Sequence, residues 1–407
     1  MILKIIKDKY FQLLLILAIS SFLIFFQFDK IPKNLSFDEI EFAQLALSLD
    51  KKPYTSYSPI AFGHSTPYFY IILSSLKLFG ISNFALRLPS AIFGILAVLM
   101  FYLVLKIVFN KKKNKPLIAD FLPFIACLIF ISSRWYLNFA RFSFEATFLL
   151  FLELSALYFF LKKRVILTAI FAGLSFLSYT PGRIFVLLPL FLLIMQKEWK
   201  NVARYLLIFF LIVAPLLLYF LYHPDYRVQE LVVKNFSQAV ESAKKIALMF
   251  HVQGDMNGRH NYPGKPALNP VFGIIFLLGL VQSIKNIHKF HNQIFIGYFI
   301  LSLIPAFFTA PSDNPNMLRT VTVIPSVVYF SVLPLIRIWN FPSVRVIGLI
   351  VFSVLIFASS AYDLRTYFLF QSRVTKNSFE IKCNLQEVIK YKIKDIPKNC
   401  RVNKNEF

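Results

Sequence analysis

Acidic residues are scarce in this chain of 407 residues, which has 20 Asp and Glu against 44 Lys and Arg and a formal net charge of +24. A nucleic-acid-binding protein of that charge needs a basic groove with interleaved aromatic residues, and the sequence lacks one. Lys and Arg instead form short clusters between apolar runs, a pattern typical of segments that face an anionic membrane leaflet. Nucleic acid is therefore not an expected partner, although the Lys-rich tail could contact another polyanion.

Cysteines are also few, at three. Cys127 lies in an apolar run and is expected in the core. Cys383 and Cys400 lie in the tail and could pair if the tail faces an oxidising compartment, a question that the sequence leaves open. An A-x-A-like cleavage site is missing after the first apolar run, so we expect residues 1–28 to be a retained span rather than a signal peptide.

Apolar residues are abundant: 57% of the chain is hydrophobic and 48 residues are Phe, whereas soluble domains average about 45–50% apolar residues. This composition predicts an all-α integral membrane protein. We expect about eleven transmembrane helices, near residues 11–28, 88–109, 117–133, 146–161, 165–180, 183–196, 203–222, 270–284, 293–310, 320–336 and 343–360.

The positive-inside rule orients these spans across the plasma membrane. Alternate connections carry basic clusters that we place in the cytoplasm, namely Lys4, Lys7 and Lys9; Lys111, Lys112, Lys113 and Lys115; Lys162, Lys163 and Arg164; Lys197, Lys200 and Arg204; Lys285 and Lys289; and Arg337 and Arg345. The N-terminus is then cytoplasmic and the C-terminus outside. The apolar stretch 67–79 is too short to cross, so we expect an interfacial helix with Tyr68 and Tyr70 at headgroup level.

The predicted organisation is one transmembrane domain, 1–360, followed by a short polar tail, 361–407, on the outside. Interfacial helices are expected in the first outer loop, 29–87, and a second long outer loop spans 223–269. The outer connections hold most of the unusual polar residues. We therefore expect an enzyme whose active site lies on the outer face.

An acidic pair, Asp38 and Glu39, follows the first span. Ser36-x-x-Glu39 fits a capping box, so a helix should begin here and run to about Leu49. Glu39 could simply cap that helix, and Asp38 could simply favour the positive end of the helix dipole. Alternatively, a carboxylate kept ionised at the membrane exit could act as a general base or a metal ligand.

A second set of polar residues surrounds the start of the span near 146–161. Glu145 begins this span, where an acid is costly unless it faces a cavity. Arg141 lies four residues earlier and could pair with Glu145 on one helix turn, or bind substrate. His64, in the first outer loop, could contact a phosphate or simply be solvated. Glu153 lies deeper in the span, with no partner that the sequence identifies.

Three further outer connections contain cations suited to an anionic substrate. Arg183 and Arg319 each stand at a span entrance, and together they could neutralise a phosphate leaving group; interfacial anchoring is the alternative. The polar loop 254–264 adds Asp255, Arg259 and His260. Its spacing does not argue for zinc.

Several segments resemble the protein mannosyltransferase superfamily, the GT-C fold membrane enzymes that use polyprenyl-phosphate sugars and include the aminoarabinose transferases of lipid A. The resemblance rests on Phe37-Asp38-Glu39, His64-Ser65-Thr66-Pro67, Phe79-Gly80-x-x-x-Phe84-Ala85-x-Arg87-Leu88-Pro89-Ser90, the 254–266 loop, and Pro311-x-x-Asn314-Pro315-Asn316-x-Leu318-Arg319. It covers most of residues 10–340.

The resemblance implies an inverting transfer of a sugar from a polyprenyl-phosphate donor to an acceptor hydroxyl on a glycan, lipid or protein. It implies that Asp38 is the essential first-loop acid, with Glu145 matching a second acid that is Asp in the aminoarabinose transferases. Arg183 stands where those enzymes have Lys. Membrane lipid is a further partner. No cofactor is required by this reading, and a divalent metal could replace part of the cationic charge.

Two other classes of protein remain open from the sequence. A transporter or lipid flippase for a lipid-linked sugar would also be polytopic, but transporters tend to carry inverted repeats and ionisable groups at mid-membrane. This chain keeps most of its charges at span ends. An inactive scaffold of the same fold is the third possibility, because fold alone does not give function.

Overall fold

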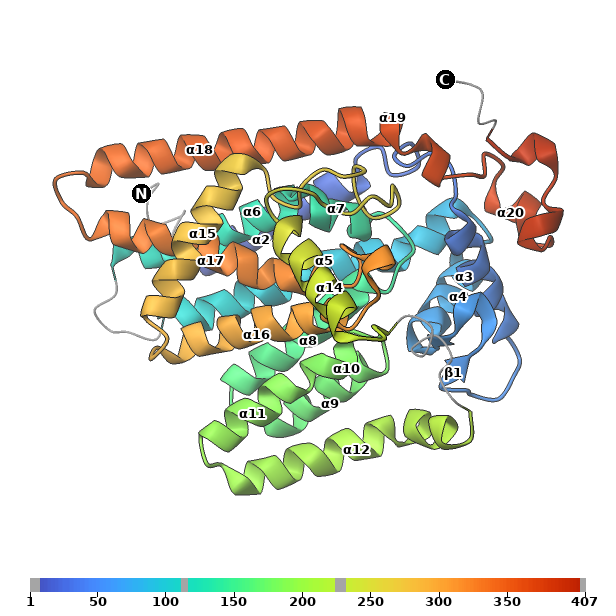
Figure 1. Ribbon diagram of the computed structural model, residues 1–407, viewed down its shortest axis with the longest axis horizontal. Coiled ribbons are helices and arrows are strands. Elements are labelled where there is room, and N and C mark those ends of the chain that lie inside the picture. Colours follow the sequence, from blue (N-terminus) through green and yellow to red (C-terminus); the bar gives the residue numbers. More distant parts are fainter. Residues whose placement is uncertain (1–7, 111–115, 224–231, 403–407) are drawn as a thin grey trace.

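The computed structural model describes residues 8–110, 116–223 and 232–402. The predicted basic clusters at 4–7 and 111–115, and part of the predicted loop 223–269, lie outside these ranges. The described chain is a helical bundle with one two-stranded antiparallel sheet (Figure 1). In that sheet β1 (Tyr57–Ser58) pairs with β2 (His64–Ser65).

Every predicted apolar segment contains a described helix, and further helices lie in the connections and in the tail. In the first half of the chain the described helices are α2 (Lys9–Phe25), α3 (Phe37–Ser48), α4 (Pro67–Phe79), α5 (Asn83–Asn110), α6 (Leu122–Ser132), α7 (Arg134–Ala140), α8 (Ala146–Leu161), α9 (Val165–Phe176), α10 (Gly182–Phe185), α11 (Leu187–Met195) and α12 (Trp199–Tyr222). The second half has α14 (Phe236–Met249), α15 (Pro270–Lys285), α16 (Phe290–Phe307), α17 (Ile324–Trp339), α18 (Arg345–Arg365), α19 (Ser372–Val374) and α20 (Leu385–Val388).

Short turns connect these helices. They are η1 (Ile60–Phe62), η2 (Leu117–Asp120), η3 (Pro311–Asp313), η4 (Val321–Val323), the π-helical turn η5 (Thr366–Gln371), η6 (Lys376–Ser378), η7 (Ile393–Asp395) and η8 (Lys398–Cys400). Through η5 and α19 the last long helix continues to Val374, so it extends beyond the predicted end of the span near 360.

Among the described residues, five helices are long and apolar enough to cross a membrane. A sixth crossing results if α6 and α7, which are bent by 67° relative to each other, form one broken span. Each of the eleven predicted segments contains a helix, several of them shorter than a full crossing. The all-α membrane fold is therefore confirmed, while the number of crossings stays a prediction.

The segments predicted to be interfacial lie at one end of the bundle. Figure 1 shows α3, α4 and α20 together at the right of the view, at the opposite end from the turn between α17 and α18. Helix α4 begins at Pro67 and ends at Phe79, as the sequence predicts. The expectation for Tyr68 is wrong: its ring is buried and its hydroxyl contacts Ser90 Oγ at 2.5 Å, so it packs inside the protein rather than among headgroups.

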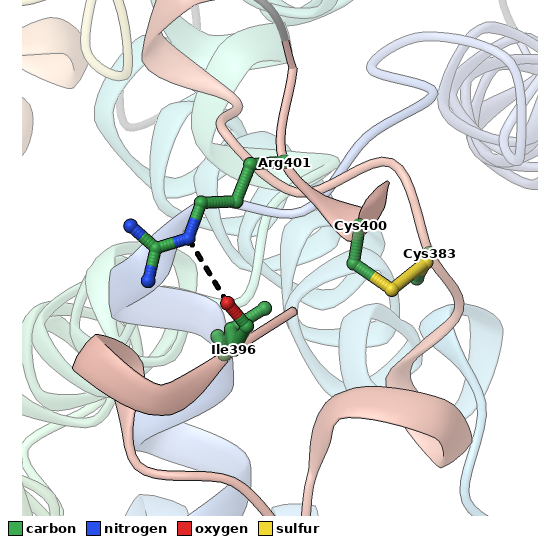
Figure 2. Close-up of a disulfide and its surroundings, with 4 residues drawn as sticks. All are labelled: Cys383, Ile396, Cys400 and Arg401. Atoms are coloured by element: carbon green, nitrogen blue, oxygen red, sulfur yellow. Dashed lines mark hydrogen bonds between the residues drawn. A yellow bond between two sulfur atoms is a disulfide. The ribbon is translucent and has the colours of Figure 1, made fainter. Parts of the chain in front are cut away.

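The C-terminal tail packs against the segment 29–87. Leu35 and Ile381 form an antiparallel bridge, and Gln44 on α3 donates to the carbonyls of Ile389 and Tyr391. Figure 2 shows the disulfide between Cys383 and Cys400, which answers the question that the sequence left open. It also shows Arg401 Nε donating to the Ile396 carbonyl, at 3.2 Å. Cys127 is buried and unpaired, as expected.

Candidate active site

The start of α3 separates the two adjacent acids into different environments. Ser36 Oγ accepts from the Glu39 amide at 3.2 Å, and Glu39 Oε2 accepts from the Ser36 amide at 3.1 Å, so the predicted capping box is present. Glu39 is fully buried and also pairs with Arg87 on α5, whose Nε and Nη2 lie 2.7 and 2.9 Å from its two oxygens. Three of these contacts occupy both Glu39 side-chain oxygens, so Glu39 fixes α3 against α5 rather than facing a substrate.

Asp38 instead faces the tail and the 254–264 loop. Its Oδ2 lies 2.7 Å from Arg259 Nη1, and Arg259 Nη2 lies 2.6 Å from Glu380 Oε1. Glu380 Oε2 accepts from the Phe37 amide at 3.2 Å, which ties the tail to the first turn of α3. The side chain of Asp38 is 31% exposed, so a ligand can reach it.

The charges of this cluster shift the pKa values of two of its members. Burial works against the charge on Arg259, but the neighbouring Asp38 and Glu380 carboxylates outweigh it and raise the pKa of Arg259. Glu41 lies three residues after Asp38 on the same helix, where burial and the Asp38 charge raise its pKa despite the opposing effect of Arg259. Asp38 therefore lies between a firmly charged arginine and an acid that gains a proton more readily than usual.

His64 and Glu145 form a second, buried pair. His64 Nδ1 and Glu145 Oε1 are 2.6 Å apart, and their side chains are 5% and 2% exposed. Rings of Phe42 and Phe69 meet the His64 ring edge-on, with centroids 5.1 and 5.2 Å away. Phe42 lies four residues after Asp38 on α3, so this pair and the Asp38 cluster lie near the same helix face.

Arg141 does not pair with Glu145. It is fully buried, and its guanidinium donates to a ring of backbone carbonyls at the end of α2 and just beyond it, those of Leu23, Ile24, Phe26, Gln27 and Ile31. A cation is favoured at a helix C-terminus, where carbonyls lack helical partners. The structure therefore places Arg141 in the scaffold, away from the predicted substrate-binding set.

Asp255 and His260 lock the loop that presents Arg259. His260 Nδ1 lies 2.8 Å from Asp255 Oδ2, and both residues are buried. The same Asp255 oxygen accepts from the Met317 amide at 2.8 Å, while Oδ1 accepts from the Asn257 amide. These contacts join the 254–264 loop to the 310–319 loop, so Asp255 and His260 hold the loops in place and Arg259 projects from them.

Arg183 and Arg319 meet in one cavity of about 240 Å³. Its walls come from α10, α16 and the connections beside them, and are formed by Tyr179, Thr180, Pro181, Arg183, Ile184, Val232, Pro305, Phe308, Thr309 and Arg319. Arg319 Nη1 contacts Asp313 at 2.6 Å and Thr309 Oγ1 at 2.9 Å, and Arg183 stacks over the Phe220 ring at 5.1 Å. The cavity thus combines two arginines with a largely apolar wall.

A smaller hollow, of about 10 Å³, lies between this cavity and the buried pair. Tyr179, Thr180 and Arg183 line both spaces, and His64 and Ser65 line the smaller one. The arginine cavity therefore adjoins the His64–Glu145 pair, which lies next to the α3 face that carries Asp38. Of the ten predicted site residues, contacts join Asp38 to Arg259, His64 to Glu145 and Asp255 to His260, while Arg183 and Arg319 line the same cavity.

Sequence reasoning missed two carboxylates at this site. Glu380 lies in the tail, where no local pattern marks it as a partner of α3. Glu41 follows Asp38 at helical spacing, which is a signal that could have placed it on the same face. Within the described ranges, Cys383, Glu387 and Cys400 are grouped closely enough for a metal, but the two cysteines form the disulfide and cannot act as thiolate ligands.

Comparison with known proteins shows which family and which fold the chain resembles. Residues 64–219 match the family model of the dolichyl-phosphate-mannose-protein mannosyltransferases. Among curated proteins, none matches the chain in sequence. The fold is similar to that of ArnT from Cupriavidus metallidurans bound to undecaprenyl phosphate, with a TM-score of 0.60 and 12% identity over 90% of this chain and 77% of that one.

The apo state of the same ArnT gives a TM-score of 0.58 at 12% identity, covering 90% of this chain and 76% of the other. At 12% identity the comparison shows that the two proteins share a fold, and it shows no more than that. The family match covers residues 64–219, which is less than half of the chain, and the fold shared with ArnT extends over 90% of it.

Proposed function

We propose that the protein transfers a sugar, with inversion, from a polyprenyl-phosphate donor to an acceptor hydroxyl at the outer face of the plasma membrane. The observation that carries the proposal is the cavity in which Arg183 and Arg319 lie beside the His64–Glu145 pair. The acceptor is a glycan, a lipid or a protein.

The cavity suits the donor chemically. Guanidinium groups bind phosphate oxygens and keep their charge, so Arg183 and Arg319 would hold the donor phosphate and stabilise it as it leaves. The apolar residues around them, among them Ile184 and Phe308, suit the first units of an isoprenoid. The bound lipid of the ArnT structure is undecaprenyl phosphate, which supports a donor of this class.

Asp38 is the residue that we assign as base. Its partial exposure lets an acceptor hydroxyl approach, and the Arg259 contact holds its carboxylate in one orientation. The acceptor oxygen attacks the anomeric carbon as its proton passes to Asp38, and the bond to the donor phosphate oxygen breaks. In this scheme Glu145 positions the sugar or the acceptor through His64, and Glu39 holds α3 in place.

The location at the outer face rests on charge and on the tail. The predicted basic clusters orient the N-terminus to the cytoplasm. The disulfide between Cys383 and Cys400 lies at the same end as Asp38, and disulfides persist in oxidising compartments outside the cytoplasm. A transporter or lipid flippase for a lipid-linked sugar is the alternative function, and it predicts movement of the headgroup without a product.

The test is sugar transfer by membranes that contain the wild type or Asp38→Asn, with a panel of radiolabelled polyprenyl-phosphate sugars. Loss of a proton acceptor typically costs 10²–10⁴-fold, so Asp38→Asn should lose roughly that much activity. Asp50→Asn is the matched control, because Asp50 is an acid of the same loop that pairs with the exposed Lys77.

Two outcomes would contradict the proposal. Equal sugar transfer by Asp38→Asn and the wild type would show that Asp38 is not the base. Movement of the donor headgroup across vesicles, with no product from any donor of the panel, would establish the transporter instead.

A further inference from the structure

A second cavity, of about 550 Å³, lies at the opposite end of the bundle from the candidate active site. The start of α2 and the ends of α5 and α8 surround it, with Lys9, Tyr10, Leu13, Tyr102, Leu103, Lys106, Ile107, Asn110, Tyr158 and Lys162 as its lining. Helix α5 has 28 residues, which at about 1.5 Å per residue is roughly 40 Å. Its first residue, Asn83, contacts the tail beside the active site, so its last residue lies a bilayer's thickness away.

The polar part of the cavity is a rim of three lysines from three different helices. Each ammonium lies over a tyrosine ring: Lys9 over Tyr10 at 4.7 Å, Lys106 over Tyr102 at 5.4 Å and Lys162 over Tyr158 at 5.9 Å. The Tyr102 hydroxyl donates to the carbonyl of Lys9 and to Gln12, which joins α5 to α2 at this point.

Two acids flank this rim, Asp8 and Asp120. The Asp8 carboxylate caps α2 by accepting from the amides of Tyr10 and Phe11, and Lys106 Nζ donates to the backbone carbonyl of Asp120 at 3.3 Å. The positive charge of the three lysines therefore exceeds the negative charge of the two acids. Below the rim, Leu13, Leu103 and Ile107 give the cavity an apolar wall.

We propose that this cavity binds the phosphate headgroup of an anionic phospholipid, with an acyl chain lying along the apolar wall. Basic pockets between membrane helices on the cytoplasmic side are suited to acidic headgroups, and tyrosines are favoured at the headgroup level. An ordinary basic anchor needs neither a cavity nor the convergence of three helices. The apolar wall distinguishes a lipid from a free phosphate or a soluble anion.

The binding does not depend on sugar transfer, so its test needs no donor. The variant is Lys9→Gln/Lys106→Gln/Lys162→Gln, and the control is Lys197→Gln/Lys200→Gln/Lys289→Gln, which removes the same charge from exposed positions in connections that we also assign to the cytoplasm. Both purified proteins are titrated with phosphatidylglycerol and, separately, with phosphatidylcholine. The readouts are thermal stability and the phosphatidylglycerol that co-purifies, measured by mass spectrometry.

Phosphatidylglycerol should raise the Tm of the wild type and of the control, and the lysine variant should bind it about fivefold more weakly for each lysine removed. Equal binding by variant and control would overturn the proposal, as would equal stabilisation by phosphatidylcholine. Inorganic phosphate that reproduces the whole shift would show a small-anion site and overturn it too. If the triple variant does not fold, Lys162→Glu alone should still weaken binding by about fivefold or more, and Lys162 suits this test because it is exposed on the rim.

Discussion

Arg259 is the residue on which the Asp38 cluster depends. Its two terminal nitrogens contact different carboxylates, Asp38 and Glu380, and its Nε donates to the Ser378 carbonyl at 3.3 Å. A planar fork of donors can serve these three partners at once, whereas a lysine ammonium is a single point charge. One residue therefore couples the proposed base to the tail.

Arg259→Lys tests this coupling while it preserves the charge. We expect the variant to fold and to lose about tenfold or more in kcat, because a loss of about 1.4 kcal/mol in positioning corresponds to tenfold. Arg204→Lys is the control, since Arg204 lies on α12 and contacts Asn201 at 3.4 Å. Unchanged kcat with Arg259→Lys would mean that the fork geometry is not needed.

Glu41 should give the stability of the protein a dependence on pH. Burial and the Asp38 charge raise its pKa above the ordinary value of 4.5, so the folded state holds this proton more tightly than the unfolded state. A raised carboxyl pKa destabilises the ionised form, and this contribution therefore lowers stability as the pH rises above 4.5. Glu41→Gln should raise the Tm at neutral pH. It should also reduce the fall in Tm that Glu41 causes when the pH rises from mildly acidic to neutral. A variant with the Tm profile of the wild type would contradict the assignment.

At the scale of elements, the tail and α3 form one unit. The bridges from Ile381 to Leu35 and to Arg401 continue the contact that Glu380 makes with the first turn of α3. The disulfide closes the chain between residues 383 and 400 within this unit. The tail therefore supports the proposed base through backbone pairing, and not through a separate domain.

The variant Cys383→Ser/Cys400→Ser tests this support. Removing a disulfide typically costs about 2–4 kcal/mol of stability, so we expect a lower Tm. Sugar transfer should fall as well, because the tail would no longer hold Glu380 against Arg259. Cys127→Ala is the control for a cysteine substitution outside the tail. A lower Tm with unchanged transfer would show that the tail stabilises the fold without positioning Asp38.

For the whole molecule, the arrangement of the helices separates two chemically different ends. Figure 1 shows α3, α4 and α20 at one end and the turn between α17 and α18 at the other. The arginine cavity and the Asp38 cluster belong to the first end, and the lysine-rimmed cavity belongs to the second. A membrane around the bundle would place these ends in different compartments.

This separation predicts a topology that labelling can measure. A single cysteine introduced at Lys398 in the tail should react with a membrane-impermeant maleimide in intact cells, whereas one at Lys197 should react after permeabilisation. The reference protein for both is Cys127→Ala, in which Cys383 and Cys400 remain paired. Reaction at Lys197 in intact cells would reverse the orientation and would place the active site in the cytoplasm.

The sequence by itself determined the class of protein and the positions of its apolar helices. Apolar runs predicted helical segments because burying apolar side chains in a bilayer requires helices with satisfied backbones. The start of α3 followed from Ser36 and Glu39, since a capping box is a local pattern. Arg183 and Arg319 were predicted to act together because both stand at outer span entrances, and the structure brings them to one cavity.

Only the tertiary structure decided which side chains meet. The sequence suggested that Arg141 could pair with Glu145, four residues away, but Glu145 contacts His64, which is 81 residues away, and Arg141 closes the end of α2. Asp38 and Arg259 are 221 residues apart. The physical reason is that a buried charged group without a partner costs free energy. Its partner is therefore whichever group the packing of the helices brings within reach, whatever the distance in sequence.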